Sequence, residues 1–450
     1  MIKRSGVIQS PDKTLLKLFN HGISNVQSKN ILCNFIKVNR SSIAIKVNNR
    51  FIQYKKISSI FPICIGKASV DMAQTFNKIT KKLKVLVHQG VIVVNKENAK
   101  KVNSFKTFIG GHPIPNQNGL KAAKYIKKYL ENSKKNDLVL VLLSGGGSAL
   151  LPYPVECLSL RDKVLINKQL IESGADIKEI NTVRKHLSQI KGGNLLKFTY
   201  PSKVHCLILS DVVGDDLSSI SSGLTSPDPT TFSKTKDILL KYKLWKKIPI
   251  SIKTYIEEGV KNKELETPKK NNKIFSNVKN SIIGSNYLCI KSIHHFCKDN
   301  KIKSKIWFKD IEMDVKKLSL NFYQNLKKQN ITKPIFLISG GETTVNIRGN
   351  GRGGRNQEFA LHFLKIMKAR LPKQKYFLLS AGTDGRDGPT DAAGAIINDQ
   401  THKILKSNSI NLEKELKNNN SYEVLKKLKS LVIINGTNTN VADVQILYVF

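Results

Sequence analysis

The clearest pattern in the chain is a run of apolar residues that stops abruptly at a glycine-rich turn. Leu138 to Leu143 is a block of consecutive aliphatic residues, which predicts one strand buried on both faces. Ser144 to Ser148, reading SGGGS, follows at once. Glycines have no Cβ and accept positive φ, so their N–H groups can converge on a phosphate or a carboxylate. A tight strand-to-helix turn is the alternative explanation.

Three further apolar segments end in a similar way. They run from Val204 to Leu209, from Pro334 to Ile338 and from Tyr376 to Leu379, and each is followed by serine and then, within two residues, by glycine or an acid. Ligands of open parallel α/β sheets bind beyond the carboxyl ends of the strands. The repetition therefore predicts an α/β fold with one shared site, although ordinary turn chemistry would explain each ending separately.

The length of 450 residues is too great for one ordinary core and indicates two domains. The segment from Lys234 to Lys279 is the poorest in core-forming residues, and we place the boundary there. We expect an N-terminal domain over 1–250, a Lys/Asn-rich connecting segment over 251–280, and a C-terminal domain over 281–450 whose last residues return to the first domain or stay in the second.

Two basic residues occupy positions where strand or loop gives way to a predicted helix. Lys67 follows Gly66 at a strand-helix junction, where its ammonium could reach an anion at the strand end. Arg355 follows a glycine-rich loop, Gly349 to Gly354, whose amides and guanidinium fork could bind the same anion. Lys67 as a solvated lysine is the ordinary alternative.

Acidic residues gather after two of the strands. Asp211 and Asp215 follow the strand at Val204, and Asp384 and Asp387 follow the strand at Tyr376. Carboxylates are natural ligands for a hard cation such as magnesium, and Asp211 could instead act as a base. Helix capping and Asx turns are the alternatives.

A basic segment and one histidine leave two explanations open. Arg184 and Lys191 lie in a predicted helix over Lys178 to Gly193, which is either an anion clamp or a charged solvent face. His112 stands in the GGHPIP loop, as a general base or as a residue that pins the loop.

Composition adds three constraints. The net charge of +42 would suit a polyanion partner, but only ten of the 75 basic residues are arginines, and no aromatic-interleaved basic motif accompanies them. The cysteines form no C-x-x-C pair, which favours free thiols in a reducing compartment. No apolar run has secretory or membrane-spanning length, so we expect a cytoplasmic protein with no specific nucleic acid and no membrane partner.

The ordered motifs resemble those of one family, the glycerate 2-kinases that join an N-terminal glycerate kinase domain to a C-terminal MOFRL domain. The resemblance rests on GKAS (66–69), GGHPIP (110–115), LLSGGGSAL (142–150), VRKHLSQIKGG (183–193), SDVVGDD (210–216), SGGETTV (339–345), GRGGRNQEFAL (351–361) and SAGTDGRDGPTDAAGA (380–395). It implies two α/β domains with mainly parallel sheets, a Rossmann-like first domain, and an active site in the interdomain cleft. It also implies transfer of the ATP γ-phosphoryl group to the 2-hydroxyl of D-glycerate with Mg2+.

On this reading Lys67, Asp211 and Arg355 are catalytic, and Asp215, Asp384 and Asp387 hold the metal. The residues expected to bind nucleotide or substrate are Ser144, Gly145, Gly146, Gly147, Ser148, Arg184, Lys191, Gly340, Gly341, Glu342 and Asn356. The small-molecule partner would be D-glycerate, with the chain a monomer or a homodimer. An NAD(P)H-dependent hydroxypyruvate reductase is one alternative, but no G-x-G-x-x-G follows a strand with an acid about 20 residues on. A nonenzymatic polyanion-binding protein is the other.

Overall fold

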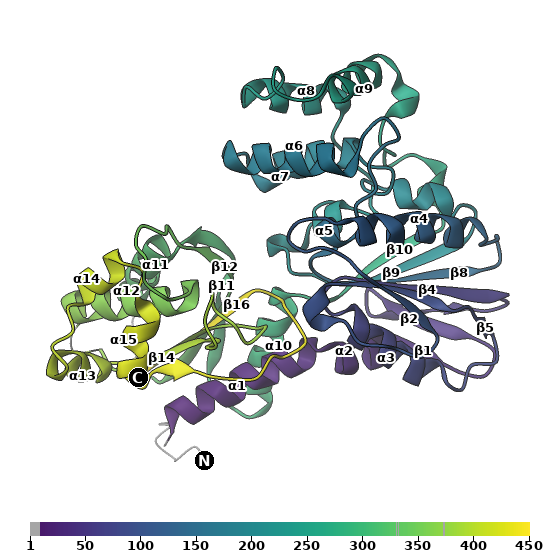
Figure 1. Ribbon diagram of the computed structural model, residues 1–450. Coiled ribbons are helices and arrows are strands. Elements are labelled where there is room, and N and C mark those ends of the chain that lie inside the picture. Colours follow the sequence, from purple (N-terminus) through teal and green to yellow (C-terminus); the bar gives the residue numbers. More distant parts are fainter. Residues whose placement is uncertain (1–9, 330, 332, 372–373) are drawn as a thin grey trace. The chain divides into compact units, whose positions relative to one another are not determined.

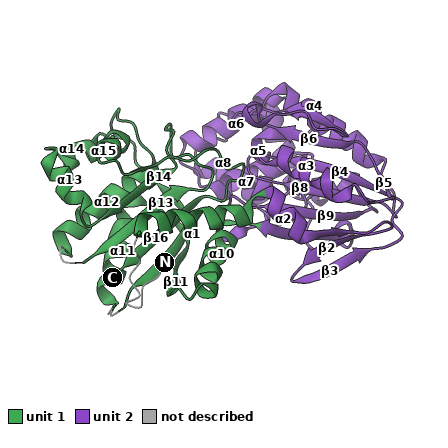
Figure 2. Cartoon of the chain, turned by 90° about the horizontal axis from the view of Figure 1, so that it is seen from below, with its two compact units in different colours: residues 1–27, 284–450 green, residues 28–283 purple. Residues whose placement is uncertain are grey.

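The chain divides into two compact units. The computed structural model describes residues 10–329, 331, 333–371 and 374–450. Unit 1 comprises residues 1–27 and 284–450, and unit 2 comprises residues 28–283 (Figure 2). The expected division differs at two points. The N-terminal segment groups with the C-terminal unit, and segment 251–280 is a folded part of unit 2, where Ile252 and Ile256 are fully buried.

Unit 2 is built around a sheet in which the strand order is β10-β9-β8-β4-β6-β7, and β5 pairs with β4. The pairs β4–β6, β4–β8, β6–β7 and β8–β9 are all parallel. These strands are β4 (Ser59–Ile65), β5 (Leu86–Val87), β6 (Gly90–Val94), β7 (Phe105–Ile109), β8 (Leu138–Leu143), β9 (Lys203–Leu209) and β10 (Val278–Gly284). The parallel sheet expected for this part of the chain is confirmed.

Both faces of this sheet are covered. Alternate residues of β4 enter two different cores: Ile63 and Ile65 pack with residues of α4, whereas Ile60 and Cys64 pack with residues of α3. Figure 1 shows α4 on one side of the sheet and α3 on the other. A strand buried on both faces is apolar along most of its length, which explains the aliphatic run of β8 and the largely apolar sequences of its neighbours.

The remaining elements of unit 2 form a small sheet and a helical layer. The small sheet is antiparallel, with β1 (Ile36–Val38), β2 (Ile43–Val47) and β3 (Arg50–Tyr54). Helices α6 to α9 share a separate apolar core. The helices are α2 (Ser28–Phe35), α3 (Ser69–Thr80), α4 (Gln117–Glu131), α5 (Gly147–Leu150), α6 (Leu160–Glu172), α7 (Ile177–His186), α8 (Phe232–Lys241) and α9 (Ile250–Lys261), with short 3-10 helices at 96–98, 194–198, 213–215, 220–222, 263–265 and 273–275.

Unit 1 contains a mixed sheet in the order β11-β12-β16-β13-β14-β15. The α/β class is confirmed, but the expectation of a mainly parallel sheet is wrong here, because the last strand runs between β12 and β13 and is antiparallel to both. Among the strands that the structure describes in this sheet, β11–β12 is the only parallel pair. The strands are β11 (Ser304–Asp314), β12 (Ile335–Thr344), β13 (Tyr376–Gly382), β14 (Gly394–Asn398), β15 (Leu431–Val432) and β16 (Asp443–Val449).

Helices complete unit 1. Helix α12 is buried along much of its length and packs with β13 and β14 in the main core of this unit. Within the described ranges, no helix is long and apolar enough to cross a membrane. The helices are α1 (Pro11–Val26), α10 (Asn286–Asp299), α11 (Val315–Lys328), α12 (Arg355–Arg370), α13 (Thr401–Ser407), α14 (Leu412–Lys417) and α15 (Ser421–Lys427).

Candidate active site

The carboxyl ends of three neighbouring strands in unit 2 carry the predicted site residues. β4 leads to Lys67, β8 to the glycine turn at 144–148, and β9 to Asp211. After β4 the chain continues to β6 on one side of the sheet, whereas after β8 it continues to β9 on the other side. Adjacent strands whose connections leave in opposite directions create a crevice at their carboxyl ends, the usual ligand position in such sheets.

Backbone hydrogen bonds hold Lys67 against the glycine turn. The Lys67 N–H donates to the Gly145 carbonyl at 2.9 Å, and the Ala68 N–H donates to Ser144 Oγ at 3.0 Å. Gly66 has a φ of +118°, and a Cβ at this position would lie 2.3 Å from Ser144 Oγ. Only glycine therefore permits the close approach that brings Lys67, a partly buried residue, to the turn.

The glycine turn contacts Asp211 and His112. A Cβ on Gly145 would lie 1.9 Å from Asp211 Oδ2, so the carboxyl group packs directly against the Gly145 backbone. A Cβ on Gly146 would lie 3.1 Å from His112 Cδ2 and 3.4 Å from Lys67 Cγ. Burial lowers the pKa of His112, and the nearby charge of Lys67 lowers it further. A base, a cation and a carboxyl group therefore gather at one turn, although the sequence left the role of His112 open.

Two serines that the sequence reasoning missed complete the turn. Ser148 Oγ lies 2.9 Å from Ser222 Oγ, which donates to Asn181 Oδ1 at 3.1 Å. Ser221 and Ser222 have φ values of +50° and +57°, a conformation that is uncommon outside glycine and marks functional sites more often than other positions. The sequence signal that could have identified them is the SSG triplet at 221–223.

Arg184 and Lys191 lie in the helical layer of unit 2. The predicted helix over 178–193 is shorter than expected, because α7 ends at His186 and Ser188 then forms a bridge to Pro154. The amide of Gly192 donates to the Ser222 carbonyl at 2.9 Å, which places the chain at Lys191 beside Ser222. Lys191 is fully buried, so the alternative of a charged solvent face is wrong for this residue.

In unit 1, Arg355 begins helix α12 and is ion-paired within its own unit. Its Nη1 contacts Glu342 Oε1, and its Nε lies 2.7 Å from Asp443 Oδ2. Burial alone would lower the pKa of Arg355, but Asp443 and Glu342 together raise it. Asp443 is buried, whereas the Glu342 side chain is 44% exposed, so the pair with Glu342 is the one that solvent weakens.

The glycines of unit 1 serve packing within that unit. Strand β12 continues through Gly340 and Gly341 to Thr344, so the loop expected after Ile338 is strand instead. A Cβ on Gly340 would lie 2.1 Å from Asn286 Oδ1, and one on Gly341 would lie 2.3 Å from the backbone of Ile311. These glycines allow close packing against α10 and β11. They lie within a strand, whereas their predicted role in nucleotide binding assumed a loop.

The amides of the glycine-rich loop before α12 are also used internally. The N–H groups of Arg348 and Gly349 donate to Asn419 Oδ1, at 2.7 and 3.1 Å. The next amides, from 350 to 352, donate to the side chains or backbone of Asn418 and Asn420. Asn418 to Asn420 therefore accept the hydrogen bonds from the amides that we expected to bind an anion.

The predicted magnesium ligands belong to different units of the chain. Asp215 is in unit 2, whereas Asp384 and Asp387 are in unit 1. Asp387 accepts from the N–H groups of Asn356 and Gln357, at 3.1 and 2.9 Å, and therefore caps helix α12. Asp384 accepts from the Arg386 N–H in an Asx turn at 2.9 Å. Among the described residues, no cluster of three or more His, Cys, Asp or Glu side chains could hold a metal.

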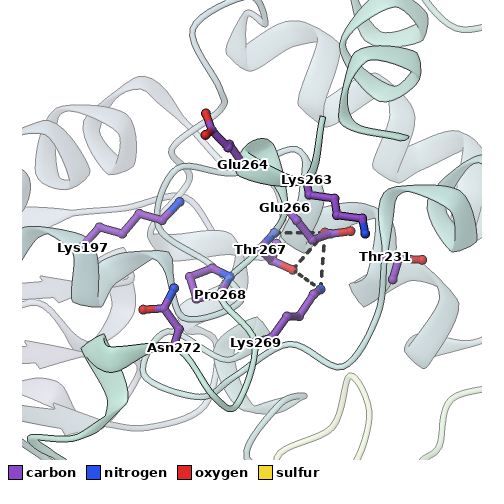
Figure 3. A pocket seen from close by; sticks show the side chains of 9 residues that line it. All are labelled: Lys197, Thr231, Lys263, Glu264, Glu266, Thr267, Pro268, Lys269 and Asn272. Atoms are coloured by element: carbon purple, nitrogen blue, oxygen red, sulfur yellow. Dashed lines mark hydrogen bonds and ion pairs between the residues drawn. The ribbon is translucent and has the colours of Figure 1, made fainter. Parts of the chain in front are cut away.

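One pocket of unit 2, with a volume of about 590 Å³, contains none of the predicted site residues (Figure 3). Glu266 accepts from His186 Nε2 at 2.7 Å and pairs with Lys269 at 3.4 Å, so the central charges of this pocket are compensated. We assign no catalytic role to it. Its lining residues are Lys197, Thr231, Lys263, Glu264, Glu266, Thr267, Pro268, Lys269 and Asn272.

Comparisons with known proteins show which family the chain resembles. Residues 14–257 match a family model described as a domain of unknown function, DUF4147, and residues 335–443 match the MOFRL family. The chain is 37% identical to a glycerate 2-kinase of Pyrococcus horikoshii, covering 96% of each chain. It is also 37% identical to a D-glycerate 2-kinase of Thermotoga maritima, over 86% of this chain and 90% of the relative. The crystal structure of a Thermotoga maritima glycerate kinase superposes with a TM-score of 0.83 at 33% identity, covering 98% of this chain and all 100% of the other.

The fold and the strand-end site, together with these similarities, define a kinase of the α/β class that transfers phosphoryl groups to small molecules. The chain belongs to the glycerate 2-kinase family, with a DUF4147 region followed by a MOFRL region. The resemblance inferred from the sequence motifs is confirmed.

Proposed function

We propose that this protein transfers the γ-phosphoryl group of ATP to the 2-hydroxyl of D-glycerate, giving 2-phosphoglycerate and ADP. The observation that carries the proposal is the convergence of Lys67, the 144–148 turn and Asp211 at the carboxyl ends of β4, β8 and β9. Phosphoryl transfer requires mainly positioning and the stabilisation of spreading negative charge. A cation, a glycine turn and a carboxyl group supply those functions.

Lys67 is proposed to stabilise the transferring phosphoryl group. Its backbone is held to Gly145, and its side chain passes Gly146. An ammonium fixed in this way meets the charge that develops on the equatorial oxygens without a reorganisation cost at the moment of reaction. The turn from Gly145 to Ser148 is proposed to position the phosphates through its backbone N–H groups, because a glycine-rich turn can direct several N–H groups toward one anion.

Asp211 is proposed to receive the proton of the 2-hydroxyl or to hold magnesium. Its carboxyl group lies against Gly145, at the turn where phosphates would bind. Magnesium in phosphotransferases takes one or two carboxylates and completes its shell with substrate phosphates and water, so Asp211 fits this role. When bound, the ion would neutralise charge on the phosphates.

Arg355 is proposed to bind an anionic group of a substrate. The guanidinium is held by the buried Asp443, and the exposed Glu342 occupies its other edge. A phosphate or carboxylate could replace Glu342 and make the same two-pronged contact, since the geometry of a guanidinium suits either group. Glu342 would then act as a stand-in for the substrate anion.

The test is the release of ADP from ATP in the presence of magnesium and either D- or L-glycerate. We expect ADP release to depend on D-glycerate and to be much slower with the L-isomer, because the 2-hydroxyl must face the phosphoryl group. Oxidation of NADH or NADPH by hydroxypyruvate without any glycerate-dependent ADP release would instead support the reductase alternative.

A further inference from the structure

Three cations gather where helices α6 and α7 meet the loop that follows α7. Lys163 on α6 is 2% exposed, and Lys191 in the loop is 0% exposed. Arg184 on α7 is partly exposed and donates from Nε to Asn167 Oδ1 of α6 at 3.1 Å. The Nζ of Lys163 donates to the carbonyl of Leu187 at 3.5 Å, and Leu187 is the residue that follows α7. The cluster of Lys163, Arg184 and Lys191 is therefore buried at its lysines and reaches solvent at its arginine.

The ammonium of Lys191 lacks the compensation that a neighbouring buried lysine has. Lys185, on the same helix as Arg184, lies 2.8 Å from the buried carboxylate of Asp228. Lys191 Nζ is fully buried and has no hydrogen-bond partner among the residues that the structure describes. Burying an unpaired charge is one of the most costly arrangements in a protein, and buried charges are normally paired. Such a group is explained if a ligand supplies the missing negative charge.

Neighbouring positive charges act on both lysines. Burial lowers the pKa of Lys191 well below its usual value, and the charges of Lys163 and Arg184 lower it further. Burial and Arg184 lower the pKa of Lys163 to about 7. A bound anion would reverse these effects, because an opposite charge a few ångströms away favours the protonated form of each lysine.

We propose that Lys163, Arg184 and Lys191 bind a phosphate group. A doubly charged phosphate compensates three cations better than a single carboxylate does, and it offers enough oxygens for two ammonium groups and a guanidinium. The cluster is connected to the glycine turn, because the amide after Lys191 binds the Ser222 carbonyl and Ser222 Oγ lies 2.9 Å from Ser148 Oγ. The phosphate could belong to the nucleotide, to the phosphorylated product or to free inorganic phosphate. The proposal concerns binding alone, so it goes beyond the proposed reaction and does not depend on it.

The first test compares thermal melting of the full chain and of Lys191→Met in chloride and in inorganic phosphate at equal ionic strength. We expect phosphate to raise the melting temperature of the parent in a saturable way, because a ligand that binds only the folded state stabilises it. In Lys191→Met the phosphate-dependent rise should disappear. The variant should melt at or above the parent in chloride, since an apolar side chain replaces a buried amine that has no hydrogen-bond partner among the described residues.

The matched control is Lys168→Met, which removes an exposed lysine from the same helix as Lys163; the Lys168 side chain is 69% exposed. This control should keep the phosphate response of the parent. Lys67→Met tests whether inorganic phosphate binds at the proposed catalytic turn instead. If Lys67→Met abolishes the response while Lys191→Met retains it, phosphate binds at the turn and the proposal is wrong.

Calorimetric titration provides a second measurement that does not depend on melting. The parent should bind inorganic phosphate, and Arg184→Gln should weaken that binding at least tenfold. Competition by ATP or by 2-phosphoglycerate would identify the source of the phosphate, and failure of both to compete would identify free phosphate as the ligand. Equal affinities in the parent, Arg184→Gln and Lys191→Met would contradict the proposal, as would the absence of millimolar phosphate binding to the parent.

Discussion

At the scale of single residues, the site depends on the lack of side chains at two glycines. Gly66 lets Lys67 approach Ser144, and Gly145 lets Asp211 lie against the turn. Lys67, the 144–148 turn and Asp211 could be predicted because each directly follows an apolar strand, and strand ends of a parallel sheet share one edge. Ser221 and Lys163 could not be predicted, because their positions depend on contacts between segments far apart in the chain.

The first residue-scale prediction concerns Lys67→Met, which keeps much of the aliphatic stem and removes the charge. We expect kcat to fall by about a hundredfold or more, with little change in either KM, because the lost charge acts mainly on the transition state. Steady-state kinetics with ATP and D-glycerate would measure both constants. Lys78→Met, at an exposed position of the following helix, is the control and should match the parent. A variant that loses only affinity would make Lys67 a ground-state binder.

The second residue-scale prediction concerns Gly145→Ala. The added methyl group would lie 1.9 Å from Asp211 Oδ2, so the carboxyl group must move. We expect turnover to fall at least tenfold and the unfolding free energy to fall by about 1–3 kcal/mol, the usual cost of overpacking. Gly436→Ala is the comparison, because no atom lies within 4 Å of the Cβ it would create. Turnover equal to that of the parent would show that the position of Asp211 is not important.

At the scale of elements, the strands and helices of unit 2 were more predictable than the loops of unit 1. The largely apolar sequences of β4, β8 and β9 identify strands buried on both faces. The glycines at 340–341 and 349–354 predicted anion-binding loops, but the first pair lies inside β12 and the second group binds Asn418 to Asn420. Glycine permits close approach to a ligand and to another backbone equally well, so its presence cannot distinguish them.

The element-scale prediction concerns the cap of α12 by Asp387. Burial raises the pKa of Asp387 to about 7, and Asp443 contributes to the rise. Because this value exceeds the ordinary pKa of an unfolded aspartate, about 3.9, the folded state holds an extra proton between the two values. The contribution of Asp387 to stability should therefore decrease as pH rises from about 4 to about 7.

Asp387→Asn would remove this pH dependence while keeping an oxygen that can accept from the helix. The melting temperature of the variant relative to the parent should rise between pH 5 and pH 8, by an amount that corresponds to a few kcal/mol at most. Thermal melting at both pH values measures the difference. A relative melting temperature that falls over this range would mean that the cap requires an ionised carboxylate and that its pKa is not raised.

At the scale of the whole molecule, family membership and the chemistry of unit 2 agree on one activity. The chain matches both family models in order, and relatives named as glycerate 2-kinases cover nearly its full length. The two-domain organisation was predictable from length. The place of the N-terminal helix was not, because the partner of α1 is α10, which lies more than two hundred residues later in the sequence.

The regiochemistry of the product tests the central claim most directly. The protein is incubated with ATP, magnesium and D-glycerate, and the products are identified by phosphorus NMR against authentic standards. The account predicts that ADP and 2-phosphoglycerate form in equal amounts and that neither forms when glycerate is omitted. Formation of 3-phosphoglycerate alone, or consumption of ATP that does not depend on glycerate, would contradict it.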